Sequence, residues 1–263
     1  MPLPPLPCAC TYPRTHPPTR PQPSKAAVFE LLDCRFYKAP TAKCVGGICN
    51  RIDFPSLGPD AAPGDKIFVF HTLIPQYAPA MWGGATDGEG FSIVQIYRMG
   101  AKAVEQVGME APTLPWARVL KRFMEAPCED VDTPTKKIHE RLKLICRLAN
   151  QEEVELGSFE KGLIGSYNAK PVLTRPQHNF YKGVNEHGVD YFEAVLDAHE
   201  FAFVAKKGLS SLLDRISDMV VDMSFTVEGH EDDELPETLL GMCRICKIDI
   251  EAACLPLPDV KKK

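Results

Sequence analysis

The chain has 263 residues, of which 44% are hydrophobic and 25% are charged, an ordinary balance for a globular protein with a core of its own. Its net charge is −5, so the chain as a whole lacks the excess of cations that binding to nucleic acid requires, and we predict no nucleic-acid partner. Ten cysteines in a chain of this length are too dilute for a disulfide scaffold, and neither a secretory signal nor a membrane-spanning apolar run is visible. We expect a cytoplasmic protein with reduced thiols.

Composition divides the chain into three parts. Residues 1–23 are rich in proline, which predicts a disordered leader whose PxxP spacings could bind an SH3 or WW domain. Residues 24–256 are expected to form one folded domain. Residues 257–263 are predicted to be a charged tail.

The first half of the domain is predicted to consist mainly of strands and loops. Stretches rich in β-branched and aromatic side chains predict strands over residues 28–34, 66–74 and 91–99. Proline and glycine predict a loop over residues 54–65 and a longer loop over residues 75–90, with Trp82 at its tip.

The middle of the chain introduces helical periodicity. Residues 115–125 begin with a proline and place Trp116, Val119, Leu120 and Phe123 on one face, which predicts a helix. Residues 136–149 predict a short helix followed by a strand, because alternate residues from Leu142 onward are apolar. A pair of strands is predicted within residues 162–174.

The last third of the chain predicts a strand, a helix and a hairpin in succession. Residues 191–199 alternate in polarity, residues 201–220 show apolar side chains at helical spacing, and strands over 221–227 and 239–250 flank a turn. We predict an α+β fold with a curved, mostly antiparallel β-sheet, a long helix packed against it and a C-terminal strand hairpin.

Three polar residues share one face of the strand over 191–199. Glu193, Asp197 and His199 could bind a metal or transfer protons. The alternative is that they line the solvated face of a half-buried sheet. Neighbours two and four residues apart lie about 7 and 13 Å apart in a strand, so the three could not reach one ion without a bend. We predict no metal and no cofactor.

Two further sequence patterns, the cysteine pairs and an acidic stretch, contain residue types that bind metals. Cys243 and Cys246 form a CxxC pair within a strand pattern, which places their thiols on opposite faces. Cys44 and Cys49 could supply a second pair for zinc, although the spacing is wide. Residues 230–234 are acidic but lack the EF-hand pattern for calcium, so a solvated turn is expected.

The helix predicted over residues 201–220 supplies the other candidate ligand-binding residues. Its apolar stripe includes Leu212 and Ile216, which could form core or line an apolar cavity. Lys206 and Lys207 near its start, and Arg175 upstream, could contact a lipid phosphate. The candidate ligand-binding set is therefore Glu193, Asp197, His199, Lys206, Leu212 and Ile216.

The chain contains no GxSxG, HExxH, GxxxxGK[ST] or GxGxxG motif. We therefore expect a non-enzymatic protein. A hydrolase or metal enzyme that uses Glu193, Asp197 and His199 is an alternative, and a site assembled from residues distant in the sequence would leave no local motif.

Four stretches carry a resemblance to a known family: residues 28–33, residues 66–75 with 91–97, residues 162–183, and residues 191–250 with Glu234-Leu235-Pro236-Glu237. Together they resemble the C-terminal domain of the Enhanced Disease Resistance 2 family. The chain departs from it at the start, where the family's opening strand has no counterpart.

In plants this domain follows pleckstrin-homology and START modules, neither of which fits in this chain. The resemblance implies a lipid or apolar small-molecule ligand, peripheral association with membranes and a regulatory or trafficking role. A protein-interaction module is the alternative.

Overall fold

The computed structural model describes residues 27–58, 61–62, 64–81, 87–128, 136–174 and 178–261. The predicted leader over residues 1–23, Trp82 and Arg175 lie outside the described residues.

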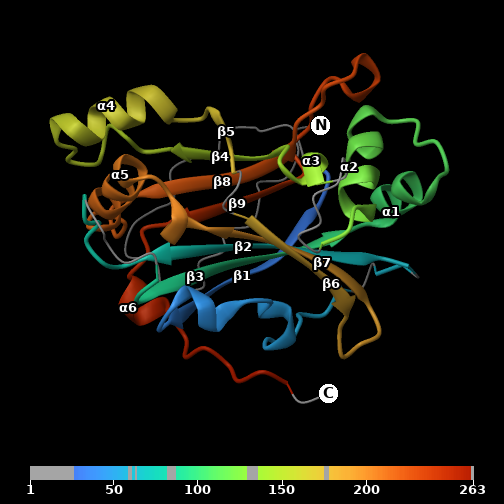
Figure 1. Ribbon diagram of the computed structural model, residues 1–263, viewed down its shortest axis with the longest axis horizontal. Coiled ribbons are helices and arrows are strands. Elements are labelled where there is room, and N and C mark those ends of the chain that lie inside the picture. Colours follow the sequence, from blue (N-terminus) through green and yellow to red (C-terminus); the bar gives the residue numbers. More distant parts are fainter. Residues whose placement is uncertain are drawn as a thin grey trace.

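The larger of two β-sheets has the strand order β1-β3-β2-β7-β6 (Figure 1). Its strands are β1 (Glu30–Ala39), β2 (Lys66–Pro75), β3 (Gly90–Met99), β6 (His178–Val184) and β7 (Asp190–Asp197). The β1–β3, β2–β3 and β6–β7 pairs are antiparallel, whereas β2 and β7 run parallel.

The smaller sheet is antiparallel in the order β5-β4-β8-β9. Its strands are β4 (Leu142–Leu148), β5 (Pro171–Leu173), β8 (Val220–Val227) and β9 (Gly241–Cys246). The predicted α+β class and the β8–β9 hairpin are confirmed. The strands divide between two sheets instead of forming one curved sheet.

Helices lie at both ends of the two sheets. They are α1 (Ala101–Gly108), α2 (Pro115–Glu125), α3 (Lys136–His139), α4 (Ser158–Tyr167), α5 (Phe203–Leu213) and α6 (Ile250–Ala253). Figure 1 shows α1 and α2 at one end of the molecule and α4 and α5 at the other. Within the described ranges no helix is long and apolar enough to cross a bilayer.

Several predicted elements match the structure and two do not. The helix over residues 115–125 has the predicted bounds. The segment over residues 162–174 is predicted to be a strand pair, but α4 extends into it as far as Tyr167 and only β5 is a strand. The helix predicted to reach residue 220 ends at Leu213 and continues as turns.

The larger sheet is buried on both faces. On one face, Ile67, Val69 and Leu73 of β2 pack against residues 41–58, which we call the cover segment. This segment contains two short 3-10 helices, η1 (Ala42–Val45) and η2 (Ile48–Asn50). Burial on both faces explains why β2 reads as an almost unbroken apolar run.

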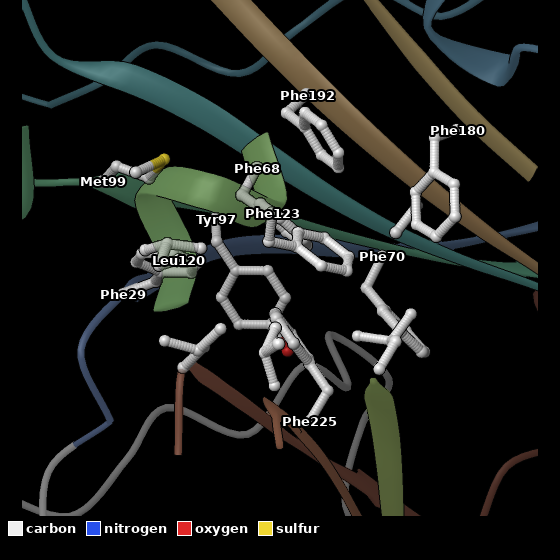
Figure 2. Close-up of a cluster of buried hydrophobic side chains, with 14 of the residues drawn as sticks. Phe29, Phe68, Phe70, Tyr97, Met99, Leu120, Phe123, Phe180, Phe192 and Phe225 are labelled. Carbon is white, nitrogen blue, oxygen red and sulfur yellow. The ribbon is translucent and has the colours of Figure 1, made fainter. Parts of the chain in front are cut away.

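An aromatic cluster fills much of the layer between the two sheets (Figure 2). The ring of Phe225, on β8, lies with its centroid 4.8 Å from that of Phe70, 5.1 Å from that of Phe68 and 5.5 Å from that of Tyr97. These separations are typical of favourable aromatic pairs. Phe225 therefore joins the smaller sheet to β2 and β3 of the larger one.

The order of strands in one sheet follows the order in the other. β9 contacts β1, and the β8 residues Met223 and Phe225 contact Gln95 of β3 and Phe70 of β2. β4 is the next strand beyond β8. It therefore lies on the side of the inter-sheet layer that is farther from β1.

Candidate functional site

The three polar residues predicted to share a face divide between two places. Glu193 lies within β7, Asp197 ends that strand, and His199 belongs to the 3-10 helix η3 (Ala198–Glu200). Glu193 and His199 are 0% exposed, so the predicted solvated face is wrong. The cover segment packs on the face of the sheet that carries Glu193 and excludes water from it.

Glu193 is the centre of a buried polar cluster. Its Oε1 accepts a hydrogen bond from the backbone N–H of Ile48 at 2.9 Å, and its Oε2 accepts one from that of Cys49 at 3.1 Å. Both donors lie in the cover segment. Burial, reinforced by the nearby Glu193 carboxylate, raises the pKa of the Cys49 thiol well above its ordinary value.

His71 and Ser92 complete this cluster. His71 Nδ1 lies 3.2 Å from Glu193 Oε1, and His71 Nε2 lies 3.0 Å from Ser92 Oγ. The order serine, histidine, carboxylate is that of hydrolase triads. All three residues are 0% exposed, and Ser92 lies inside β3 rather than on a strand-to-helix turn. These buried hydrogen bonds therefore hold the cover segment against the larger sheet.

Sequence reasoning missed His71 and Ser92. Each is a polar residue inside a strand that is mostly apolar. That pattern is the signal that could have found them, because a polar side chain in a strand buried on both faces needs a buried partner.

Asp197 and His199 form a second, smaller cluster. The Asp197 carboxylate accepts a hydrogen bond from the backbone N–H of His199 at 2.9 Å, and His199 Nδ1 lies 3.0 Å from the Tyr77 hydroxyl. Burial lowers the pKa of His199 and raises that of Asp197. Lys206 donates to the His199 carbonyl at 3.2 Å.

No candidate metal site forms from these residues. Within the ranges that the structure describes, no group of three or more His, Cys, Asp or Glu side chains could hold an ion. Cys49 packs beneath the larger sheet and Cys243 packs between the sheets. Cys49 and Cys243 therefore lie on opposite faces of the larger sheet and cannot share one zinc ion.

The apolar residues of the predicted 201–220 helix also divide. Leu212 packs with Leu148 and Met219 in a small cluster at the edge of the smaller sheet. Ile216 lies in the turns that follow α5 and, with Leu209 and Leu213, packs against the cluster between the sheets. α5 thus presents one side to the inter-sheet layer.

Cys146, on β4, has an unusual environment. It lies opposite Met223 in the β4–β8 pair, so its side chain points into the inter-sheet layer, as that of Met223 does. It is exposed to solvent, and yet desolvation by the surrounding protein raises the pKa of its thiol to about 12. From these two observations and the orientation of the side chain, we infer that Cys146 borders a recess in the inter-sheet layer.

The neighbours of this recess are apolar and incompletely packed. Leu144 of β4, Val221 of β8, and Leu209 and Leu213 of α5 all pack at the edge of the inter-sheet cluster while remaining partly exposed. Buried core residues normally exclude water completely. We call the inferred space beside Cys146 the Cys146 recess. Leu144 and Val221 are its neighbours on the β4–β8 face, and Leu209 and Leu213 of α5 belong to the same apolar cluster.

The described elements define an α+β protein of two packed, mostly antiparallel sheets. Residues 19–249 match the family model described as Protein ENHANCED DISEASE RESISTANCE 2, C-terminal. The chain belongs to this family, as its sequence resemblance implied. Neither the curated proteins nor the solved structures include a significant match.

Proposed function

We propose that this protein binds a lipid or another apolar small molecule in the Cys146 recess, and that it acts without catalysis in regulation or trafficking in the cytoplasm. One observation carries the proposal: the Cys146 side chain is open to solvent and also strongly desolvated. A water-filled recess with apolar walls is costly, and an apolar ligand removes that cost by displacing the water.

The surroundings of the recess support an apolar ligand. Four of its five bordering side chains are Leu or Val, and the fifth is a thiol kept neutral by its raised pKa. No charged group borders it among these residues. The ligand class is therefore one whose buried part is hydrocarbon.

A pair of tryptophan substitutions tests the recess directly. Cys146→Trp should fill it, whereas Ile145→Trp places the same side chain on the opposite face of β4. We expect the purified wild-type protein and Ile145→Trp to yield a stoichiometric lipid on solvent extraction and mass spectrometry and to bind the fluorescent fatty acid cis-parinaric acid. Cys146→Trp should do neither.

The stability of the same variant separates a recess from a solid core. Filling a recess should change the free energy of unfolding by less than about 1 kcal/mol, whereas forcing a tryptophan into packed core should cost about 3 kcal/mol or more. An empty wild-type protein together with a strongly destabilised Cys146→Trp variant would overturn the proposal.

A further inference from the structure

The outer side of the α4–α5 pair is rich in exposed apolar side chains. Nine large hydrophobic side chains are exposed in the described part of the chain, and three of them lie on α4 and α5. These are Phe159 (42% exposed), Tyr167 (58%) and Val204 (62%). Their concentration in one small region distinguishes it from the scattered exposed residues elsewhere.

The same region is basic although the protein is acidic. Residues 158–173 and 203–213 contain four lysines, Lys161, Lys170, Lys206 and Lys207, and one acidic residue, Glu160. The Glu160 carboxylate is engaged by the Ser211 hydroxyl, between the two helices. The net charge of the whole chain is −5, so the local excess of cations is specific to this region.

A direct contact joins the aromatic and basic components. Lys207 Nζ lies 5.4 Å from the centroid of the Phe159 ring, within the range of a cation–π interaction. Val204 lies one helical turn before Lys207 on α5, so its side chain is on the same side of the helix. We call Phe159, Val204 and Lys207, together with Tyr167 of α4, the α4–α5 face.

α5 carries this face on one side and borders the Cys146 recess on the other. Leu209 and Leu213 pack toward the inter-sheet layer, and Leu213 lies about 180° around the helix from Val204. α4 covers α5 through the contact of Leu163 with Gly208, and no residue of α4 is buried. These two helices therefore separate the recess from whatever contacts the α4–α5 face.

We propose that the α4–α5 face docks on the surface of an anionic lipid bilayer, which brings the Cys146 recess next to the membrane. Exposed aromatic and aliphatic side chains suit insertion at the headgroup level, and the lysines complement anionic lipids. The inference rests on the proposed function, because it identifies the surface through which a lipid ligand is exchanged.

Two valines with the same exposure provide a matched test. Val204, on α5, and Val184, at the end of β6, are both 62% exposed. We would measure co-sedimentation of the full chain with vesicles of phosphatidylcholine mixed with phosphatidylserine, and with vesicles of phosphatidylcholine alone. The wild-type protein and Val184→Asp should bind the mixed vesicles more tightly than the neutral ones. Val204→Asp should bind the mixed vesicles about tenfold more weakly.

A charge variant tests the electrostatic part. Lys207→Gln should lower affinity for the mixed vesicles and leave the weak binding to neutral vesicles unchanged. Equal binding by Val204→Asp and Val184→Asp would overturn the proposal. So would a wild-type dimer, measured by analytical ultracentrifugation without vesicles, that Val204→Asp dissociates, because the face would then cover a second copy of the chain.

Lipid extraction separates this proposal from the proposed function. If docking is wrong but the recess binds lipid, all three surface variants retain the extracted lipid and bind vesicles like the wild-type protein. If the recess binds nothing but docking is right, the wild-type protein yields no lipid and Val204→Asp still loses vesicle binding.

Discussion

At the scale of single residues, the buried carboxylate of Glu193 holds the cover segment, which contains two short 3-10 helices, against the larger sheet. It accepts two backbone hydrogen bonds from η2 and contacts His71. These partners are themselves buried, so removing the carboxylate leaves them without an acceptor, and unsatisfied buried donors are costly. The cover segment depends on this contact as well as on its apolar packing.

We expect Glu193→Gln to lower the free energy of unfolding by about 3 kcal/mol, because the amide oxygen can accept from only one of the two backbone N–H groups and the amide nitrogen would face the other as a second donor. Urea denaturation followed by circular dichroism measures this loss. Glu200→Gln, at an exposed position seven residues along, should change stability by less than about 0.5 kcal/mol. Equal stability of the two variants would contradict the fastening role.

His139 predicts a pH dependence. Burial lowers the pKa of His139 below its ordinary value. Its ring stacks on that of Phe180, with the centroids 4.1 Å apart, and its Nε2 contacts the Phe123 carbonyl oxygen. The unfolded chain therefore binds a proton at His139 that the folded chain does not, so folding stability falls as the pH drops below about 6.5. The slope from this residue is at most about 1.4 kcal/mol per pH unit.

The measurement compares urea denaturation at several pH values between 7.5 and 5. His139→Gln should make the decline that the wild-type protein shows below about pH 6.5 less steep, while the part due to the lowered pKa of His199 persists. His187→Gln, at an exposed histidine, should keep the wild-type slope. A decline that persists unchanged in His139→Gln would assign the effect to other groups.

At the scale of elements, the predictions succeeded where local chemistry and packing agree. α2 begins with Pro115 at its first turn, and its buried residues Ala117, Val119, Leu120 and Phe123 repeat at helical spacing, so its bounds were predictable. β2 and β3 were predictable from their β-branched and aromatic content. α4 was missed because Gly162 and Gly165 resemble turn residues, and none of its side chains is buried.

Two glycines in different elements should respond oppositely to the same substitution. A Cβ on Gly241, at the start of β9, would lie 2.4 Å from Phe225 Cε1 and 2.9 Å from Tyr97 Cζ, whereas a Cβ on Gly165 in α4 meets no atom within 4 Å. We expect Gly241→Ala to destabilise the protein by about 2 kcal/mol. Gly165→Ala should stabilise it by up to about 1 kcal/mol, as measured by thermal unfolding.

The two outcomes test different parts of the fold. If Gly241→Ala leaves the stability unchanged, the aromatic side chains between the sheets can shift to make room for the added methyl group. A destabilising Gly165→Ala would mean that α4 depends on a conformation that only glycine adopts.

At the scale of the whole molecule, the two sheets are tightly joined at the aromatic cluster and less completely packed at the Cys146 recess. A ligand that binds only the folded state raises its stability by about 2.7 kcal/mol at a concentration 100 times the dissociation constant. We therefore expect delipidation to lower the melting temperature by roughly 5–10 °C.

Calorimetry before and after delipidation measures this change, and adding back the extracted lipid should restore the original value. Cys146→Trp should have the same melting temperature before and after delipidation. A wild-type protein that is indifferent to delipidation would argue against an occupied recess.

The sequence by itself determined the class of the fold, most of the strands, helix α2, the C-terminal hairpin and the family, because these depend on side-chain periodicity and on residues close together in the chain. It also identified Glu193, Asp197, His199, Lys206, Leu212 and Ile216 as candidates. Their grouping was decided only by the tertiary structure. The cover segment lies more than 130 residues from Glu193 in the chain and buries it, and the stacking of two separate sheets leaves Cys146 both accessible and desolvated. Such contacts arise from the way distant segments pack, and no local pattern of residues encodes them.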